Sequence, residues 1–244
     1  MHKLKLSVEY DGTAYHGWQV QPGLPTIQGF LQETAKRISG EEVRITGAGR
    51  TDAGVHALGQ VANFWTAKDL ACESWQRAFN GLLPPDIVVR RAETVPDGFD
   101  ARRSAKQKTY RYSILNAPHP SALDRHWLLH IPDRLDVASM ADAVASLIGE
   151  HDFSAFRAAD GNSPNSVRRV YEASFLTQGH RLEFVITGDG FLKHMIRIVV
   201  GTLLDVGRGR LTPATFRKIL ESKDRQHAGK TARPHGLCLM EVSY

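Results

Sequence analysis

The order of hydrophobic patterns along the chain is the feature that most constrains its fold. In the first half, strand-like alternation and helical spacing of apolar residues follow one another as strand, helix, strand, strand, helix, strand. The expected strands cover residues 4–10, 43–48, 61–65 and 87–95, and the expected helices cover residues 27–38 and 70–79. This βαββαβ order is that of the ferredoxin-like plan.

The second half repeats this order. Strands are expected at residues 106–114, 170–177, 182–187 and 237–244, and helices at 140–148, 191–203 and, shorter, from Thr212-Pro213 onward. Asp136 is the expected N-cap of the helix over 140–148. We therefore predict an α+β protein of two ferredoxin-like domains related by pseudo-duplication, residues 1–103 and 104–244. Their mixed or antiparallel sheets are expected to meet at a central cleft.

Composition narrows the class of protein. The chain has 244 residues, of which 42% are hydrophobic and 23% charged, as in an ordinary globular protein. No apolar run approaches the roughly 18 residues of a membrane span, which favours a cytoplasmic protein. Cys72 and Cys238 have no nearby Cys or His at ligand spacing, so no metal site is expected. The net charge of +5 favours an anionic partner, and the pair Arg168-Arg169 is one candidate contact.

The segment Gly47–Ala57 is the strongest candidate for a functional loop. It places Asp52 in a glycine-rich turn between two strand-like runs, where a ligand can approach the main chain closely. Arg50 lies two positions before Asp52 and can favour its ionised form. An Asp-Ala-Gly string by itself is more often a simple turn, so the longer string decides the interpretation.

The string Gly49–Ala57, read as Gly-Arg-Thr-Asp-Ala-Gly-Val-His-Ala, resembles the signature of the tRNA pseudouridine synthase A family. Four further blocks resemble the family in the same order and spacing: Tyr10–Gln19, Lys108–Tyr112, Phe191–Arg197 with Gly201-Thr202-Leu203, and Pro234–Leu239. Arg233 departs from the pattern, because a small residue is expected before Pro234.

The resemblance implies an isomerase that converts uridine to pseudouridine at positions 38 to 40 of the tRNA anticodon stem-loop. It implies tRNA as partner, a homodimer, a catalytic site in the central cleft, and no cofactor or metal. Asp52 would be the nucleophile, because a carboxylate can capture an electrophilic carbon and later be expelled. Attack on C1′, attack on C6 and a glycal route with Asp52 as base all remain open.

The resemblance also assigns roles to other residues. Tyr110 would stack on the target base and act in proton removal, although alternation alone favours a core tyrosine. Arg197, expected on a helix face with Lys193 and His194, would pair with Asp52. Arg50, beside the nucleophile, would help to extrude the base or would face a phosphate. Leu237 would form an apolar wall of the uracil pocket. The clustering of positive charge, and not the resemblance, suggests Arg168 and Arg169 as tRNA contacts. His56 lies in a turn after a glycine and is expected in a structural hydrogen bond rather than as a general base.

Three other functional classes fit part of the sequence. A non-catalytic RNA-binding module explains the charge but not the carboxylate loop. A nucleotide-phosphate enzyme could use Gly47–Gly54 as an anion cradle, but the spacing matches no phosphate motif and Asp52 would repel phosphate. A retaining glycosidase needs a second carboxylate, and no partner for Asp52 stands out.

Overall fold

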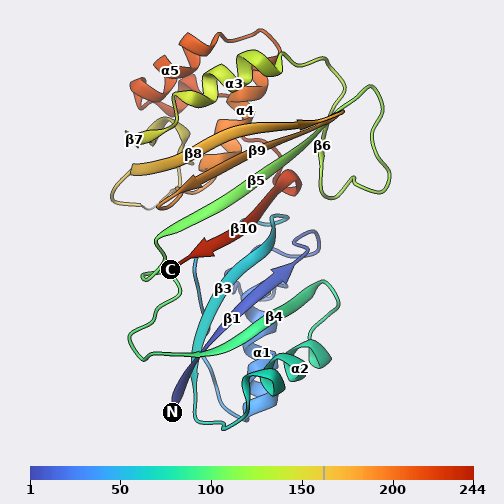
Figure 1. The fold of residues 1–244 in the computed structure, drawn as a ribbon, viewed down its shortest axis with the longest axis vertical. Helices are drawn as coiled ribbons and strands as arrows, with labels where there is room; N and C mark the ends of the chain where they lie inside the picture. Colours follow the sequence, from blue (N-terminus) through green and yellow to red (C-terminus); the bar gives the residue numbers. More distant parts are fainter. Residues whose placement is uncertain (162) are drawn as a thin grey trace. The chain divides into compact units, whose positions relative to one another are not determined.

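The structure, a computed structural model, describes residues 1–161 and 163–244 and separates into two units (Figure 1). Unit 1 comprises residues 1–106 and 238–244, and unit 2 comprises residues 107–237. The described residues form five α-helices and ten β-strands, with both antiparallel and parallel strand pairs. The protein is therefore of mixed α and β class.

Unit 1 is built on a sheet in which β1 lies between β3 and β4. Its strands are β1 (His2–Tyr10), β2 (Thr46–Gly47), β3 (His56–Thr66), β4 (Ile87–Val95) and β10 (Leu237–Ser243). β1 pairs antiparallel with both β3 and β4, and β2 pairs antiparallel with β3. β10 pairs with β3 in parallel, with Cys238 opposite His56. The final strand therefore groups with unit 1, whereas we expected it with the second domain.

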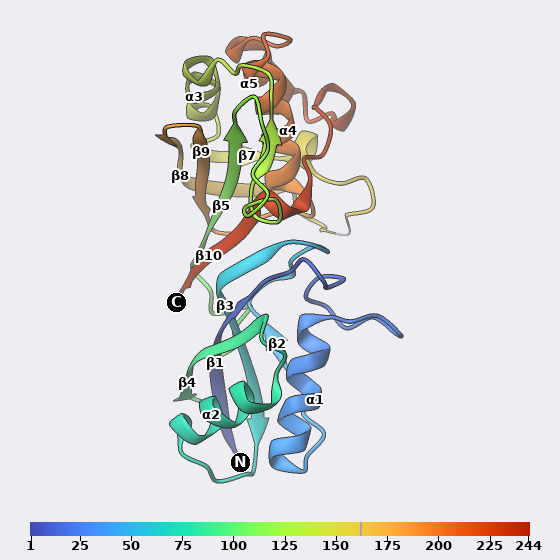
Figure 2. The same ribbon diagram turned by 90° about the vertical axis from the view of Figure 1, so that its right-hand side faces the viewer.

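Two helices pack on this sheet, α1 (Ile27–Ser39) and α2 (Cys72–Leu82). They contact one another, and α2 also contacts β4; Figure 2 shows α1 running along the sheet. The alternating residues of β1 supply the buried face, as the sequence predicts. Phe64, Trp75 and Phe79 form an aromatic cluster with ring centroids 5.6 to 6.2 Å apart. This cluster is the centre of the unit 1 core.

The strand expected at residues 43–48 is limited to Thr46–Gly47. Side chains of α1 form hydrogen bonds with the main-chain groups of Ile45, which a neighbouring strand would otherwise bind. Gln28 Nε2 donates to the Ile45 carbonyl at 2.7 Å, and Gln32 Oε1 accepts from the Ile45 amide at 3.3 Å. The expectation was wrong over most of this range, because helix side chains replace the sheet partners of that segment.

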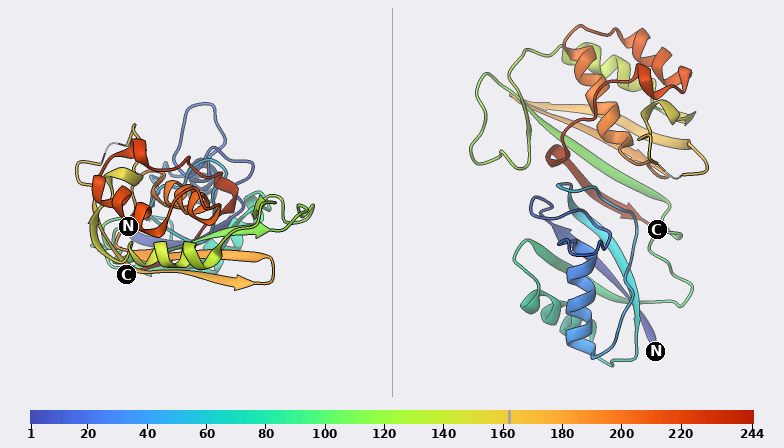
Figure 3. Two further views of the ribbon diagram at one scale, coloured as in Figure 1. Left: turned by 90° about the horizontal axis from the view of Figure 1, so that it is seen from above. Right: turned by 180° about the vertical axis from the view of Figure 1, so that it is seen from behind.

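The strands of unit 2 have three helices on one side, as Figures 1 and 3 show. Its strands are β5 (Gln107–Asn116), β6 (Leu129–Ile131), β7 (Gly149–Asp152), β8 (Val167–Gln178) and β9 (Arg181–Gly188). The pairs β5/β9, β8/β9 and β7/β8 are antiparallel, and β5/β6 is parallel. The strands expected at residues 170–177 and 182–187 pair as an antiparallel hairpin, with Gly179 of the turn in the left-handed region at φ 59°.

The helices of unit 2 are α3 (Val137–Ala145), α4 (Met195–Gly207) and α5 (Pro213–Ser222). The expected N-cap at Asp136 is confirmed, because its side chain accepts from the Ser139 amide. The short helix expected from Thr212-Pro213 is also present, and the Thr212 side chain accepts from the Thr215 amide. Phe156 and Phe216 stack with centroids 5.5 Å apart in the core beneath α5. In the described part of the chain, no helix is long and apolar enough to cross a membrane.

The helix expected from residue 191 begins only at Met195. His194 has a left-handed backbone with φ 60°, and the Lys193 carbonyl accepts from the Ala158 amide at 3.1 Å. Lys193 and His194 therefore do not share a helical face with Arg197, and that expectation was wrong. Instead, Lys193 Nζ pairs with Asp160 Oδ2 at 2.6 Å.

Candidate active site

Asp52 lies in a tight turn of unit 1 between β2 and β3. The Val55 amide donates to the Asp52 carbonyl at 3.1 Å, and Gly54 has φ 75°, a conformation that strongly favours glycine. The Asp52 side chain is half-buried and the neighbouring Ala53 is exposed. The turn therefore presents the carboxylate at the surface of the unit while its main chain is fixed.

A buried hydrogen-bond network holds the Asp52 loop, residues 47–57. Gln60 Nε2 donates to the Gly49 carbonyl at 3.0 Å and to the Tyr10 hydroxyl at 3.4 Å. The Tyr10 hydroxyl lies 2.8 Å from Thr51 Oγ1. Burial raises the pKa of the Tyr10 hydroxyl, so it keeps its proton at neutral pH. This bond ties the Thr51 side chain, in the residue before Asp52, to the buried network.

The segment that precedes α1 packs closely on the Asp52 loop. A Cβ atom on Gly12 would lie 2.0 Å from the Val55 carbonyl oxygen, and one on Gly17 would lie 2.5 Å from the Thr51 carbonyl oxygen. The Trp18 amide also donates to the Thr51 carbonyl at 3.0 Å. Two sequence blocks far apart in the chain, Tyr10–Gln19 and the Asp52 loop, are thus one packed structure.

Arg50 and His56 flank the turn differently. Arg50 is exposed, and its Nε donates to Gln19 Oε1 at 3.1 Å. His56 is buried, and its Nδ1 accepts from the Gly12 amide at 3.1 Å. The structural hydrogen bond expected for His56 is present, and it ties the loop to the segment before α1.

Tyr110 and Tyr112 lie on the same face of β5 in unit 2, because side chains two apart on a strand point the same way. Tyr110 is 7% exposed, and its ring meets Phe191 edge to face with centroids 5.2 Å apart. Tyr112 is fully buried, and its hydroxyl donates to the Arg233 carbonyl at 2.6 Å. Burial raises the pKa of Tyr112, although the positive charges of Arg197 and Arg233 oppose the shift.

Arg197 on α4 fixes an irregular segment that leads into β10. Its Nε donates to the Ala232 carbonyl at 2.8 Å, and its own carbonyl accepts from the Ala232 amide at 3.0 Å. One turn further along α4, Thr202 Oγ1 accepts from the Gly229 amide at 2.9 Å. A Cβ on Gly201 would lie 1.7 Å from the Lys230 carbonyl oxygen, so glycine permits this contact. Leu237, buried at the start of β10, follows this segment.

The two arginines expected to contact tRNA have different surroundings in unit 2. Arg168 is half-buried; its guanidinium donates to the Asn165 carbonyl at 3.0 Å and to Ser163 Oγ at 3.1 Å. Arg169 is exposed and forms a 3.1 Å ion pair with Glu150. Arg168 therefore holds a loop, and Arg169 offers its charge to solvent.

The predicted site residues divide between the units. Arg50 and Asp52 share one loop of unit 1, and Tyr110, Arg197, Leu237, Arg168 and Arg169 belong to unit 2. Among the described residues, no group of three or more His, Cys, Asp or Glu side chains is placed to hold a metal ion.

Comparison with known proteins identifies the family. The model of the tRNA pseudouridine synthase family matches residues 6–102 and 143–244. The chain belongs to the tRNA pseudouridine synthase family. It is thereby an isomerase, as the resemblance of the sequence blocks implied. The first matched range includes Asp52 and the second includes Arg197, whereas Tyr110 lies between the two ranges.

Relatives of this synthase match it over its whole length. A protein of Caldicellulosiruptor bescii named tRNA pseudouridine synthase A is 46% identical over 244 residues, covering 100% of both chains. Proteins of the same name from Bacillus subtilis and Myxococcus xanthus are 44% and 47% identical, covering 99% and 100% of this chain and 99% and 92% of their own. Among solved structures, a chain of a Cbf5-Nop10-Gar1 complex aligns with a TM-score of 0.36 and 14% identity over 96% of this chain and 57% of its own.

Sequence reasoning missed three residues that position the synthase's candidate site. Gln60 and Thr51 brace the Asp52 loop from inside the unit, and Tyr112 anchors the Arg233 carbonyl. Gln60 had a visible signal, because it is a polar residue within the apolar run of β3. Tyr112 alternates with Tyr110, but nothing in the sequence shows that its hydroxyl meets a backbone carbonyl 121 residues away.

Proposed function

We propose that this protein isomerises uridine to pseudouridine at positions 38 to 40 of the tRNA anticodon stem-loop, with Asp52 as nucleophile. The observation that carries the proposal is the match to relatives of equal length named tRNA pseudouridine synthase A. The Asp52 loop supports it independently, because a braced main chain presents a half-buried carboxylate at a turn.

The chemistry suits a carboxylate. Isomerisation breaks the N1–C1′ bond and forms a C5–C1′ bond; the base loses the proton on C5 and gains one on N1, so atoms and electrons balance within the substrate. A carboxylate can stabilise the electrophilic sugar carbon, or add to the base, and then leave unchanged. Attack on C1′, attack on C6 and a glycal route would each use the Asp52 carboxylate.

The residues of unit 2 would act on the base. Tyr110 would stack on the extruded uracil and take part in removing the C5 proton, with Phe191 fixing the ring of Tyr110. Leu237 would supply an apolar wall, and Arg197 would orient and charge-stabilise Asp52. Arg50 would hold the gap left by the base, because extrusion costs a few kcal/mol. Arg169, with its exposed charge, and Arg168 would contact tRNA phosphates.

Fold and assembly complete the proposal. In unit 1, the order β1–α1–β2–β3–α2–β4 with β1 between β3 and β4 supports a ferredoxin-like domain. In unit 2, β5, α3, β8, β9 and α4 follow the first five elements of the same plan. We propose that residues 1–103 and 104–244 are two domains related by duplication. We also propose that the active assembly is a homodimer and that the protein acts in the cytoplasm, where tRNA is processed.

The test is pseudouridine formation on an unmodified anticodon stem-loop RNA with uridine at position 39. The wild-type protein is compared with Asp52→Asn and with Asp142→Asn, a matched change at an exposed carboxylate of α3. We expect pseudouridine with wild type and Asp142→Asn, and none with Asp52→Asn. Binding of the RNA by wild type without pseudouridine would instead favour a non-catalytic RNA-binding module.

A further inference from the structure

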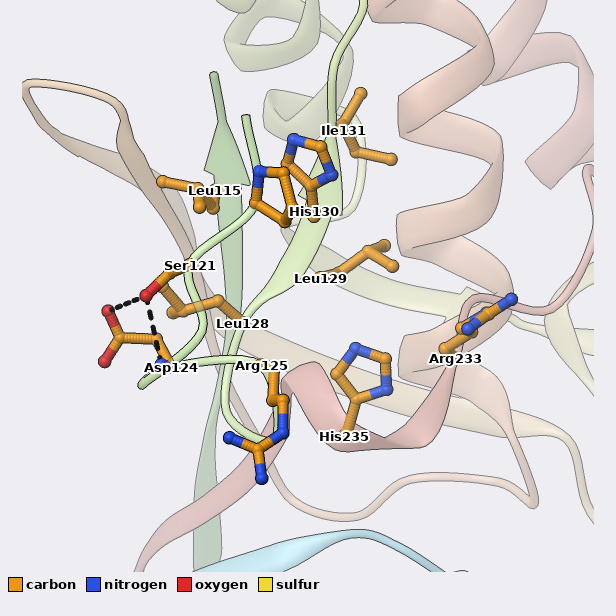
Figure 4. A pocket seen from close by; sticks show the side chains of 11 residues that line it. Leu115, Ser121, Asp124, Arg125, Leu128, Leu129, His130, Ile131, Arg233 and His235 are labelled. Atoms are coloured by element: carbon orange, nitrogen blue, oxygen red, sulfur yellow. Dashed lines mark hydrogen bonds between the residues drawn. The ribbon is translucent and has the colours of Figure 1, made fainter. Parts of the chain in front are cut away.

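Unit 2 contains a cavity of about 460 Å³ that the candidate site does not use (Figure 4). It lies between the end of β5, β6, the loop of residues 117–128 and the segment from Arg233 to His235. Its apolar wall consists of Leu115, Leu128, Leu129 and Ile131, and Arg125, Arg233, His130 and His235 line its polar side. A volume of this size, apolar with a few polar groups, is typical of a site for a small organic ligand.

Positive charge dominates the polar side. Within residues 1–161 and 163–244, no carboxylate lies within ion-pair distance of the guanidinium of Arg125 or Arg233, and both side chains are exposed. Asp124 also lines the cavity, but Arg181 pairs with its carboxylate at 2.8 Å and Ser121 Oγ donates to it at 3.1 Å. The cavity therefore favours an anionic ligand.

His130 adds a polar group of defined direction. Its Nε2 lies 2.7 Å from the Ala117 carbonyl, which can only accept, so Nε2 carries the hydrogen. In the neutral ring, Nδ1 is then an acceptor. An apolar wall beside an acceptor suits a planar nucleobase, whose ring N–H or amino group can donate while its faces pack on leucine side chains.

Hydrogen bonds from Tyr112 and Arg197 hold the main chain at Arg233. Tyr112 binds its carbonyl at 2.6 Å, and Arg197 binds the carbonyl of the preceding Ala232 at 2.8 Å. The same segment continues to Leu237. Arg233 is also the position where this chain departs from the small residue that the resemblance predicts.

We propose that this cavity binds a second nucleotide of the RNA substrate, a loop nucleotide other than the uridine that reacts. Its base lies against the leucine wall, and its phosphate contacts Arg125 and Arg233. The proposal rests on the proposed function, since it takes the substrate to be a tRNA anticodon stem-loop. It assigns to Arg233 a role in holding the RNA, outside the chemistry at Asp52.

The experiment measures binding of the anticodon stem-loop RNA by fluorescence anisotropy over a salt series. Arg125→Ala and Arg233→Ala are each compared with Arg217→Ala, which removes one exposed charge from α5. We expect each cavity variant to weaken binding about threefold to tenfold and to reduce the salt slope by about 0.7. Equal effects in all three variants would overturn the proposal, because they would reflect net charge alone.

A crosslinking arm locates the nucleotide. Stem-loop RNAs with 4-thiouridine at one loop position at a time are irradiated with the full-length protein. Crosslinks from one position other than the target are expected within residues 115–131, and they should be lost in the Arg125→Ala, Arg233→Ala double variant. A crosslink there from the target uridine alone, or none, would contradict the proposal.

Further measurements distinguish a tethered loop nucleotide from a free nucleotide, and distinguish failure of the cavity proposal from failure of the proposed function. Excess uridine 5′-monophosphate should not displace the crosslinked RNA, since a loop nucleotide is tethered; displacement would point to a site for free nucleotides. Leu129→Trp fills the cavity without changing charge and should weaken RNA binding. If the wild-type protein forms pseudouridine and the cavity variants bind RNA normally, only the cavity proposal is refuted. If the wild-type protein forms no pseudouridine, the proposed function is refuted.

Discussion

The two irregular segments that carry the candidate site are held by opposite means. The Asp52 loop is braced by residues that do not take part in the proposed chemistry: Tyr10, Thr51 and Gln60 below it and Gly17 against it. The Arg233 segment, residues 229–236, is held by side chains of β5 and α4, and one of its three side-chain clamps is Arg197, a predicted catalytic residue.

This difference shows where function and stability can be separated. At the Asp52 loop, the described bonds that fix the turn use main-chain groups and the side chains of Thr51, His56 and Gln60. A change of the Asp52 carboxylate therefore leaves that bracing intact. At the Arg233 segment, the guanidinium that would pair with the nucleophile also binds the Ala232 carbonyl, so its loss has both effects.

The largest expected effect is that of Asp52→Asn. It keeps the size of the side chain and the carbonyl that closes the turn, and removes the charge. We expect activity to fall by at least about a thousandfold. The free energy of unfolding should change by less than about 0.5 kcal/mol. Single-turnover kinetics and urea unfolding measure the two; a large loss of stability would show that the carboxylate itself braces the loop.

Gly17→Ala tests the bracing of the Asp52 loop directly. Gly17 has φ 86°, and a new Cβ would lie 2.5 Å from the Thr51 carbonyl oxygen. We expect a loss of about 2 to 4 kcal/mol of stability together with reduced activity. Gly81→Ala in α2, where a Cβ meets nothing within 4 Å, is the control and should be neutral or slightly stabilising. Similar unfolding curves for both variants would refute close packing at Gly17.

Arg197→Lys tests the double role of the clamp on the Arg233 segment. Lysine keeps the positive charge but lacks the Nε–H that binds the Ala232 carbonyl. We expect a loss of about 1 to 2 kcal/mol in unfolding free energy, with lower activity. Arg217→Lys on the exposed face of α5 should change neither. An active but less stable Arg197→Lys variant would make Arg197 a structural clamp only.

Variants of Arg168 and Arg169 should have smaller effects, and they also test whether RNA binding and stability can be changed separately. Arg169→Ala should weaken RNA binding a fewfold and reduce the salt slope by about 0.7 to 0.9, with unchanged stability. Arg168→Ala should also lower stability, because its guanidinium bonds to Ser163 and Asn165. Salt-dependent binding and thermal unfolding distinguish the two. Unchanged affinity at every salt concentration in both variants would remove them from the tRNA contact surface.

The smallest effect concerns acid stability of unit 2. The hydrogen bonds from Ser154 to Asp152 lower the pKa of this carboxyl, with the Lys223 charge contributing. A lowered pKa in the folded state means that the stabilisation is complete above the ordinary aspartate pKa and is lost as pH falls through the folded-state value. Asp152→Asn should flatten the decline of stability in acid, whereas Asp142→Asn should not. Identical acid profiles would assign the decline to other groups.

The sequence predicted most elements because local patterns determine them. Alternation along β1, the cap at Asp136, the helix start at Thr212-Pro213 and the glycine of the β8–β9 turn each act within a few residues. The predictions of element boundaries failed where the local sequence pattern did not determine the main-chain conformation or its hydrogen-bond partners. Gln28 and Gln32 of α1 replaced the strand partners of Ile45, and the left-handed backbone at His194 delayed α4.

For this protein, the sequence by itself determined the family, the class of fold and the candidate nucleophile, because the motif around Asp52 is long and its residue types are dictated by chemistry. Tertiary structure alone decided what holds that nucleophile, which arginine is exposed, and that a cavity with unpaired charges at Arg125 and Arg233 exists. The physical reason is that hydrogen bonds and burial depend on groups far apart in the chain. Residue type predicts what a group can do, but only packing determines which partner it meets.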